Sequence, residues 1–199
     1  MRVREALDRL DAIHDHLARV EVYHGFRAAV VAVVGVIGLL AAAAQPILAC
    51  APDDFVIYWV AVAGFCAIIG FGPAVYSYAA IETDLARRRT RLVFGQFLPC
   101  VVAGAVVTAA FVRIGSSFFP VLPGVWAILF GLGLISAQPY LPRAVGWVGL
   151  FYLAAGCILL AWGADHEAPS RWAVGGVFGP GHLVTALALA LDKLEEVDD

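Results

Sequence analysis

Charged residues are scarce in this chain. Only 15% of its 199 residues are Asp, Glu, Lys or Arg, and lysine occurs once, at Lys193. A soluble domain carries about 25% charged and about 45–50% apolar residues, whereas 62% of this sequence is hydrophobic and its mean hydropathy is +0.86. The net charge of −3 gives no field that would recruit nucleic acid. The composition therefore predicts a polytopic membrane protein whose first partner is the lipid bilayer.

The usual signatures of catalysis and of cofactor binding are also missing. The sequence contains no GxSxG, HExxH or P-loop motif, and its four cysteines form no CxxC pair. Only one histidine lies in an apolar run, so a haem held by two histidines of one chain is not expected. We expect no metal and no cofactor, and we favour a protein that is not an enzyme. An intramembrane pair of Ser136 and His182 stays open as an alternative, although no nucleophile turn surrounds Ser136.

Six apolar runs are each long enough to cross a bilayer core of about 30 Å, which takes roughly 20 helical residues. Backbone amides in lipid must be paired within the chain, and no run alternates with the period of a β-barrel strand. We therefore predict an all-α integral membrane protein with six transmembrane helices joined by short loops. The predicted spans are 26–49, 55–81, 92–112, 121–138, 143–163 and 173–191.

Basic residues are distributed unequally between the two ends of these spans. If the N-terminus lies inside, the outer loops hold only Arg113 and Arg171 of the thirteen Lys and Arg residues. This asymmetry follows the positive-inside rule and predicts that both termini are cytoplasmic. The first apolar run lacks a cleavage context, so we expect a retained span rather than a signal peptide. Aromatic anchors are expected near the outer span ends, at Trp59, Trp126, Trp162 and Trp172.

Residues 1–25 precede the first span and have a charged, helical pattern. Apolar side chains recur at spacings of three and four residues from Val3 to Val20, and His24 extends this heptad seam. One interpretation is an amphipathic cytoplasmic helix that lies on the inner leaflet. The other is a seam for self-association or for a protein partner. The predicted division of the chain is this helix, a membrane domain at 26–191 and an acidic cytoplasmic tail at 192–199.

The two halves of the membrane domain resemble each other. "AQPIL" at 44–48 and "AQPYL" at 137–141 end the first and fourth spans, while "FLPC" at 97–100 and "FGPG" at 178–181 lie in the third and sixth. Three spans reverse the chain direction, so the second copy would be inverted, which is a common plan among transporters. Accidental similarity is the alternative, because chance matches are frequent in sequences rich in Ala, Val, Leu and Gly.

The sixth span contains a cluster of residues that disfavour a helix. Four glycines and Pro180 lie at 175–181, directly before His182, and Pro99 interrupts the third span at a comparable depth. Paired interruptions of this kind point to a transporter-like binding site. We predict a helix break near 179–181 and a ligand site that comprises His182, Pro180, Gly181, Gln96 and Pro99. The alternative is that the glycines permit close helix packing around a tolerated proline kink.

His182 is the only titratable side chain placed deep in this span. Such a group is costly in hydrocarbon and usually faces the protein interior, so we expect a neutral imidazole that contacts a carbonyl freed by Pro180, or a ligand. The first functional hypothesis is small-solute binding or transport through a site between spans three and six. The alternative is a membrane-resident regulatory or assembly protein that acts through residues 1–25.

Two short stretches carry a family resemblance, "LPGVW" at 122–126 and "LPRAVGW" at 141–147. With the charged N-terminal segment and six spans, the chain resembles uncharacterised bacterial inner-membrane proteins of about this size. The resemblance implies a bacterial inner membrane as the location. It implies no activity and no functional residues.

Overall fold

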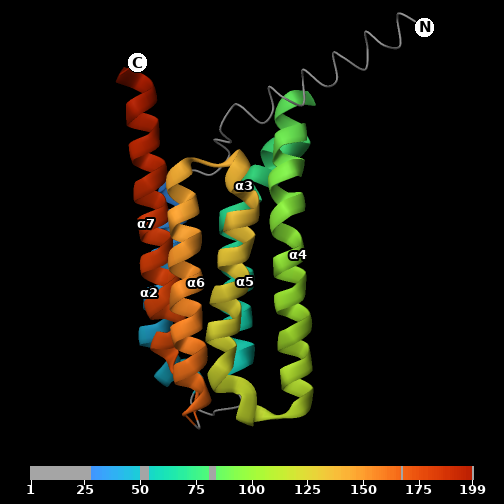
Figure 1. Cartoon of the computed structure of the whole chain (residues 1–199), viewed down its shortest axis with the longest axis vertical. Helices are drawn as coiled ribbons and strands as arrows, with labels where there is room; N and C mark the ends of the chain where they lie inside the picture. Colours follow the sequence, from blue (N-terminus) through green and yellow to red (C-terminus); the bar gives the residue numbers. More distant parts are fainter. Residues whose placement is uncertain (1–27, 50–53, 81–83, 167, 199) are drawn as a thin grey trace, which may run out of the picture.

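The structure is a computed structural model that describes residues 28–49, 54–80, 84–166 and 168–198. Within these ranges the chain is helical and contains no strand (Figure 1). The long helices are α2 (Ala28–Leu48), α3 (Asp54–Ala80), α4 (Asp84–Ile114), α5 (Leu122–Ala137), α6 (Arg143–Ala164) and α7 (Arg171–Asp198). Two short 3-10 helices flank α5, namely η1 (Ser116–Val121) and η2 (Gln138–Tyr140). The described chain has six helical segments long and apolar enough to cross a membrane, which confirms the predicted six-span helical architecture.

Two helices extend beyond the spans predicted for them. The residues from Asp84 to Arg91, which lie between the second and third predicted spans, are already part of α4, and the part of α4 long and apolar enough to cross a membrane is Thr90–Ile114. The apolar part of α7 ends at Leu191, and its helical backbone continues through the acidic tail to Asp198. The predicted amphipathic helix at 1–25, with its heptad seam, lies outside the described residues.

The helix boundaries follow from local chemistry. Gly115 has a φ of 138°, a backbone conformation that favours glycine, and it separates α4 from η1. Pro123 lies in the first turn of α5, and Pro142 directly precedes α6. The missing amide hydrogen of proline removes no intrahelical bond at these positions.

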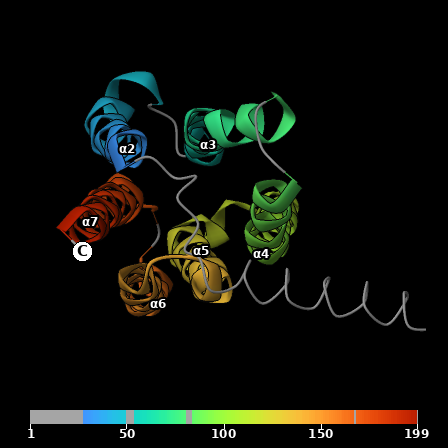
Figure 2. The same ribbon diagram turned by 90° about the horizontal axis from the view of Figure 1, so that it is seen from above.

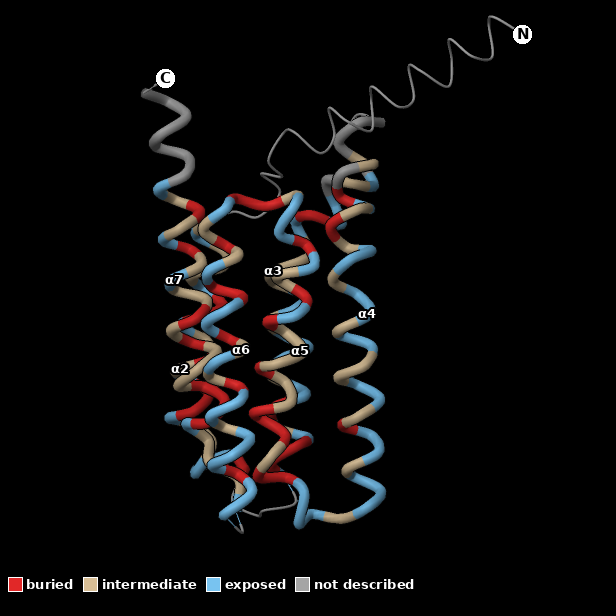
Figure 3. The backbone as a smooth tube through the Cα atoms, in the orientation of Figure 1, coloured by how far each residue is buried: buried red, intermediate tan, exposed pale blue. Residues whose placement is uncertain are grey.

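Seen from above, the helices form a ring in chain order (Figure 2). Each helix packs against the next, and α7 returns to α2, the first described helix. The α2–α7 and α5–α6 contacts are the most extensive, whereas those of α3 with its two neighbours are sparse. α4 is exposed along most of its length, and buried positions are more frequent on α5 (Figure 3). The bundle therefore contains two tight helix pairs, α2–α7 and α5–α6, and α3 is the helix attached most loosely to its neighbours.

Glycines explain why these two pairs are tight. A Cβ atom added at Gly175 of α7 would lie 2.6 Å from the carbonyl oxygen of Gly38 in α2. A Cβ atom at Gly124 of α5 would lie 2.8 Å from the carbonyl oxygen of Gly156 in α6. Real side chains do not approach so closely, so the helices meet backbone to backbone. Small residues at such contacts are typical of membrane helices, which associate mainly through van der Waals packing.

Aromatic side chains fill the end of the bundle where α2 meets α3. Trp59 of α3 is buried, and its indole Nε1 donates a hydrogen bond to Oε1 of Gln45 at 2.9 Å. Trp126 of α5 donates from Nε1 to the hydroxyl of Thr108 at 2.8 Å. The expectation of interfacial anchors is therefore wrong for Trp59, which belongs to the core, while Trp162 and Trp172 are exposed. Gln45 lies near the end of α2, and its hydrogen bond with Trp59 joins α2 to α3.

Candidate functional site

The predicted break of the sixth span is wrong. α7 is a continuous helix from Arg171 to Asp198, with Pro180 inside it. Gly175 and Gly179 are one turn apart, and Cβ atoms built there would collide with Gly38 and with Leu39 of α2. These glycines are contact points, because close packing of α7 on α2 offsets their low helix propensity. A proline is tolerated in a membrane helix when neighbouring helices support the backbone around it.

Gly181 lies on another face of α7 and makes room for a side chain of α6. A Cβ atom at this position would overlap the phenol of Tyr152. Tyr152 is fully buried, and its hydroxyl lies 3.3 Å from the carbonyl oxygen of Phe178 and 3.0 Å from Nδ1 of His182. The glycine and the tyrosine therefore form one contact that brings a hydroxyl group into the interior of the bundle.

His182 faces this hydroxyl, and its contacts indicate which of its two ring nitrogens carries the proton. Its Nδ1 lies 2.8 Å from the carbonyl oxygen of Phe178, four residues back on α7. We assign the proton to Nδ1, because an unprotonated Nδ1 would turn a lone pair toward the carbonyl lone pairs. Nδ1–H then donates to Phe178, and the hydroxyl of Tyr152 donates to the same oxygen. The sequence predicted a contact with a carbonyl freed by Pro180, which would be that of Gly176, four residues back; His182 instead contacts the carbonyl of Phe178.

The second ring nitrogen of His182 is left as an acceptor. Nε2 has no hydrogen-bond partner among the described residues. In the described part of the chain, the only fully buried side-chain nitrogen or oxygen without a partner is Nε of Arg87, so Nε2 is not completely enclosed. This acceptor within the span is thus without a hydrogen-bond donor in the described part of the chain.

Aromatic rings surround the imidazole. The ring of Phe130 from α5 lies 5.4 Å from that of His182, between centroids, and the rings of Tyr152 and Phe178 lie at 6.2 and 6.4 Å. Phe130 also meets the Tyr152 ring edge-on at 4.8 Å. Three helices therefore contribute to one cluster, which we call the His182 cluster and define as Phe130, Tyr152, Phe178 and His182.

The structure does not bring the α4 residues of the predicted site to this cluster. Gln96 and Pro99 are both exposed on α4. α4 neighbours α3 and α5 in the ring, whereas α7 neighbours α6 and α2, so α4 and α7 lie on opposite sides of the bundle (Figure 2). Pro180 and Gly181 do adjoin His182 on α7. The predicted set therefore divides into two separate places.

Sequence reasoning missed Tyr152, Phe130 and Phe178. One signal was available for Tyr152: a tyrosine in the middle of an apolar span must bury a hydroxyl group, which requires a partner in lipid. Ser136, the alternative partner of His182, is exposed on α5, six residues beyond Phe130. It is not among the hydrogen-bond partners of His182.

Comparison of the chain with protein-family models, with curated proteins and with solved structures gave no match.

Proposed function

We propose that this chain binds a small solute at the His182 cluster and carries it across the membrane. The observation that supports the proposal is the Nε2 acceptor of His182, which has no hydrogen-bond partner in the described part of the chain. An acceptor without a partner is costly in hydrocarbon. A solute that carries an N–H or O–H group would supply the missing hydrogen bond.

The surroundings of Nε2 define the chemistry of this solute. The contacts of the imidazole ring are with the rings of Phe130, Tyr152 and Phe178. Ligand sites of this type combine an apolar wall with a few polar groups that fix orientation. The solute class is therefore a small, uncharged, mostly apolar molecule with one hydrogen-bond donor, such as an alcohol, a phenol or an amide. The site lies between α5, α6 and α7, and Gln96 and Pro99 are not part of it.

We also propose a bacterial inner membrane and cytoplasmic termini. Arg88 and Arg91 on α4 and Arg143 at the start of α6 lie toward the end of the bundle where α7 also ends, whereas Arg113 and Arg171 lie toward the opposite end (Figure 1). Basic residues accumulate on the cytoplasmic side of membrane proteins. The resemblance to bacterial inner-membrane proteins supports the proposed location, and the basic residues support the proposed orientation.

Thermal unfolding of the purified protein with a panel of small alcohols, phenols and amides would test the proposed site. A solute that binds only the folded protein raises the unfolding temperature in a concentration-dependent way. We expect at least one member of the panel to stabilise the wild type and to lose this effect in His182→Phe, which keeps a ring but removes Nε2. Uptake of that solute into proteoliposomes would then test transport.

His166→Phe is the matched control. Nδ1 of His166 also lies 2.7 Å from the carbonyl oxygen four residues back, that of Trp162. His166, however, is exposed and lies just after the end of α6. We expect this variant to keep the full response to the solute. If His182→Phe responds like the wild type, or if it only unfolds at a lower temperature and no solute stabilises either protein, His182 is a structural contact and the proposal fails.

A further inference from the structure

The hydroxyl group of Tyr152 faces two polar atoms of α7 at once. Its oxygen lies 3.3 Å from the carbonyl oxygen of Phe178 and 3.0 Å from Nδ1 of His182, and Nδ1 lies 2.8 Å from that carbonyl oxygen. Tyr152 is fully buried, and within the described part of the chain these two atoms are its hydrogen-bond partners. Each of the three atoms is therefore within hydrogen-bond distance of the other two.

The three atoms differ in the hydrogen bonds that they can make. A carbonyl oxygen only accepts, a tyrosine hydroxyl both donates and accepts, and a ring nitrogen of neutral histidine donates if it carries the proton and accepts if it does not. With the proton on Nδ1, the form assigned above, the Phe178 oxygen accepts from His182 and from Tyr152. If the proton is on Nε2 instead, the Tyr152 hydroxyl can turn its hydrogen toward Nδ1. Of the two partners of Nδ1, only Tyr152 therefore supports both tautomers of His182.

The second tautomer requires little rearrangement. The hydroxyl hydrogen of Tyr152 rotates about the C–O bond while the ring stays in place. Because α7 is a continuous α-helix, the carbonyl oxygen of Phe178 still accepts the backbone amide four residues on. The remaining cost is the lone pair of Nδ1 at 2.8 Å from this oxygen, which makes the second tautomer the minor form in the protein without solute. A solute that binds the minor form more tightly shifts the population toward it.

Close packing holds the two side chains in these positions. The ring of Phe130 lies 4.8 Å from that of Tyr152 and 5.4 Å from that of His182, between centroids. A Cβ atom at Gly181 would overlap the phenol, so α7 lies directly against it. A change of tautomer moves hydrogen atoms only, and the shape of the site is the same in both forms. Two solutes of equal shape are therefore distinguished by their hydrogen-bonding groups.

We propose that Tyr152 is a positioning residue that lets Nε2 of His182 act as an acceptor or as a donor, so that the site also binds small apolar solutes with only a hydrogen-bond acceptor, such as ketones. This inference rests on the proposed function, because it assigns a second class of solute to the same site. In the exchange, one proton leaves Nδ1 and one arrives at Nε2, so the ring stays neutral. Water takes up the first proton and supplies the second.

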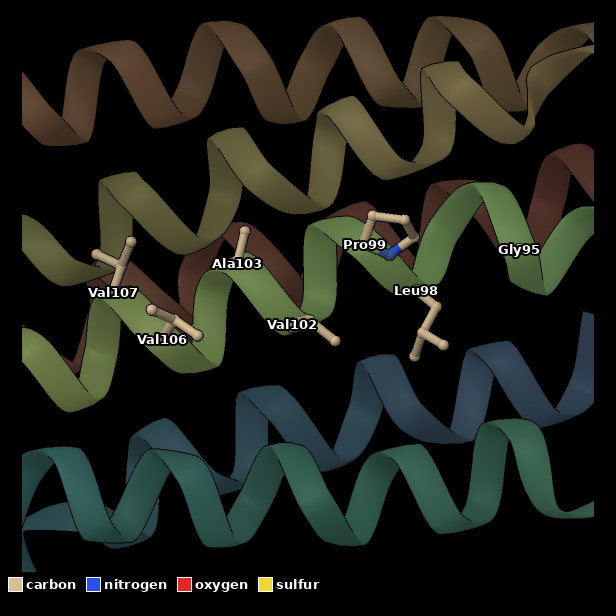
Figure 4. A pocket seen from close by; sticks show the side chains of 7 residues that line it. All are labelled: Gly95, Leu98, Pro99, Val102, Ala103, Val106 and Val107. Carbon is tan, nitrogen blue, oxygen red and sulfur yellow. The ribbon is translucent and has the colours of Figure 1, made fainter.

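A hollow on α4 offers a small apolar solute no such choice. It has a volume of about 560 Å³ and is lined from Gly95 to Val107 by residues of α4 alone (Figure 4). None of the described residues that line it has a polar side chain. A solute held there by apolar contact would bind independently of Tyr152, which lies on α6. Sensitivity to Tyr152 therefore separates binding at the His182 cluster from binding to an apolar surface.

Cyclohexanol and cyclohexanone provide a test, because they have nearly the same shape and only the alcohol carries a donor. The affinity of the full-length protein for each is measured from the concentration dependence of its unfolding temperature. We expect both to stabilise the wild type. Tyr152→Phe keeps the ring and removes the hydroxyl, so it should lower the ratio of ketone affinity to alcohol affinity about fivefold, the effect of one neutral hydrogen bond.

Tyr58→Phe is the matched control. The hydroxyl of Tyr58 on α3 also donates to a carbonyl oxygen of a neighbouring helix, that of Ala41 at 2.6 Å, but it is not part of the His182 cluster. This variant should keep the wild-type ratio. Thermal unfolding without solute shows whether each variant is folded.

Nitrogen NMR of histidine-labelled wild type tests the tautomer directly and needs no folded Tyr152 variant. The resonances of His182 are those missing from His182→Phe. We expect Nδ1 to carry the proton in the free protein and Nε2 to carry it with saturating cyclohexanone.

The outcomes separate this inference from the proposed function. If cyclohexanol stabilises the wild type and cyclohexanone does not, the site exists and the exchange of tautomer is wrong. The inference is also overturned by an unchanged affinity ratio in Tyr152→Phe, by an equal fall of the ratio in Tyr58→Phe, or by a proton that stays on Nδ1 with the ketone bound. If neither solute stabilises the wild type, the inference fails for this pair of solutes, and the wider panel of alcohols, phenols and amides decides the proposed function.

Discussion

Gly181 of α7 lies directly against the phenol of Tyr152 in α6, with no room for even a methyl group between them. This contact determines how close α6 and α7 are beside His182. It also explains why a glycine follows Pro180 in a helix that does not break there. Three of the four glycines in the sixth span are therefore helix contacts: Gly175 and Gly179 lie against α2, and Gly181 lies against Tyr152.

Gly181→Ala is expected to destabilise the protein by about 1–3 kcal/mol, the usual cost of overpacking. The added methyl group must displace the ring of Tyr152, which is fully buried and cannot move freely. Thermal unfolding in detergent measures the effect. Gly176→Ala is the control on the same helix, since its new Cβ would meet only Trp172 at 3.8 Å. Equal unfolding temperatures for the two variants would contradict the packing described here.

Gly175→Ala is expected to separate α2 from α7 and to lower stability by a similar amount. The new Cβ would lie 2.6 Å from the carbonyl oxygen of Gly38, and backbone atoms cannot turn aside as a flexible side chain can. Gly64→Ala in α3 provides the comparison, because nothing lies within 4 Å of a Cβ atom at that position. That variant should be neutral or slightly stabilising, by up to about 1 kcal/mol. A loss of stability in Gly64→Ala equal to that in Gly175→Ala would refute the prediction.

Gln45→Leu is expected to cost about 0.6 kcal/mol and at most about 1.7 kcal/mol, the measured range for hydrogen bonds between membrane helices. The substitution removes the acceptor of the buried Trp59 indole, which is otherwise held at 2.9 Å. Unfolding in a denaturing detergent gives the difference in free energy. Gln138→Leu, at an exposed position after α5, should cost less. The reverse order of the two costs would show that the Gln45–Trp59 bond does not contribute to stability.

Residue 88 is expected to be reachable only from the cytoplasm, and residue 113 only from outside. Residue 88 precedes the apolar part of α4, Thr90–Ile114, and residue 113 lies at the far end of that part. Single-cysteine variants Arg88→Cys and Arg113→Cys, in a background without the four natural cysteines, can be labelled with an impermeant maleimide on intact cells. Labelling of residue 88 from outside would reverse the proposed orientation.

The spans could be predicted from the sequence because each depends only on its own composition. Long apolar runs form helices in lipid whatever their neighbours are, so the six spans agree with the structure to within a few residues at most ends. The site could not be predicted in the same way, because it depends on which helices are adjacent. The similarity of "FLPC" and "FGPG" suggested that Pro99 and Pro180 meet, whereas the ring order separates α4 from α7.

The His182 cluster is a second example of a site that depends on which helices are adjacent. His182 stood out in the sequence as the only titratable residue deep in this apolar span, and the structure places it against α5 and α6. Its partner Tyr152 carried one signal, a hydroxyl group in the middle of an apolar span, but the sequence could not show that this hydroxyl lies 3.0 Å from Nδ1 of His182. Gly181 was interpreted as a helix breaker because the residue that requires the space lies 29 positions earlier in the chain.

The contact between α2 and α7 also has a consequence for biosynthesis. More than 120 residues separate the end of α2 at Leu48 from the start of α7 at Arg171. At a synthesis rate of about 5–20 residues per second, α2 emerges roughly 6–25 seconds before its main partner. The α5–α6 pair is complete before α7 has left the ribosome, so α2 enters the membrane early and remains without that partner. Of the described helices, the last to be made is the one that closes the ring.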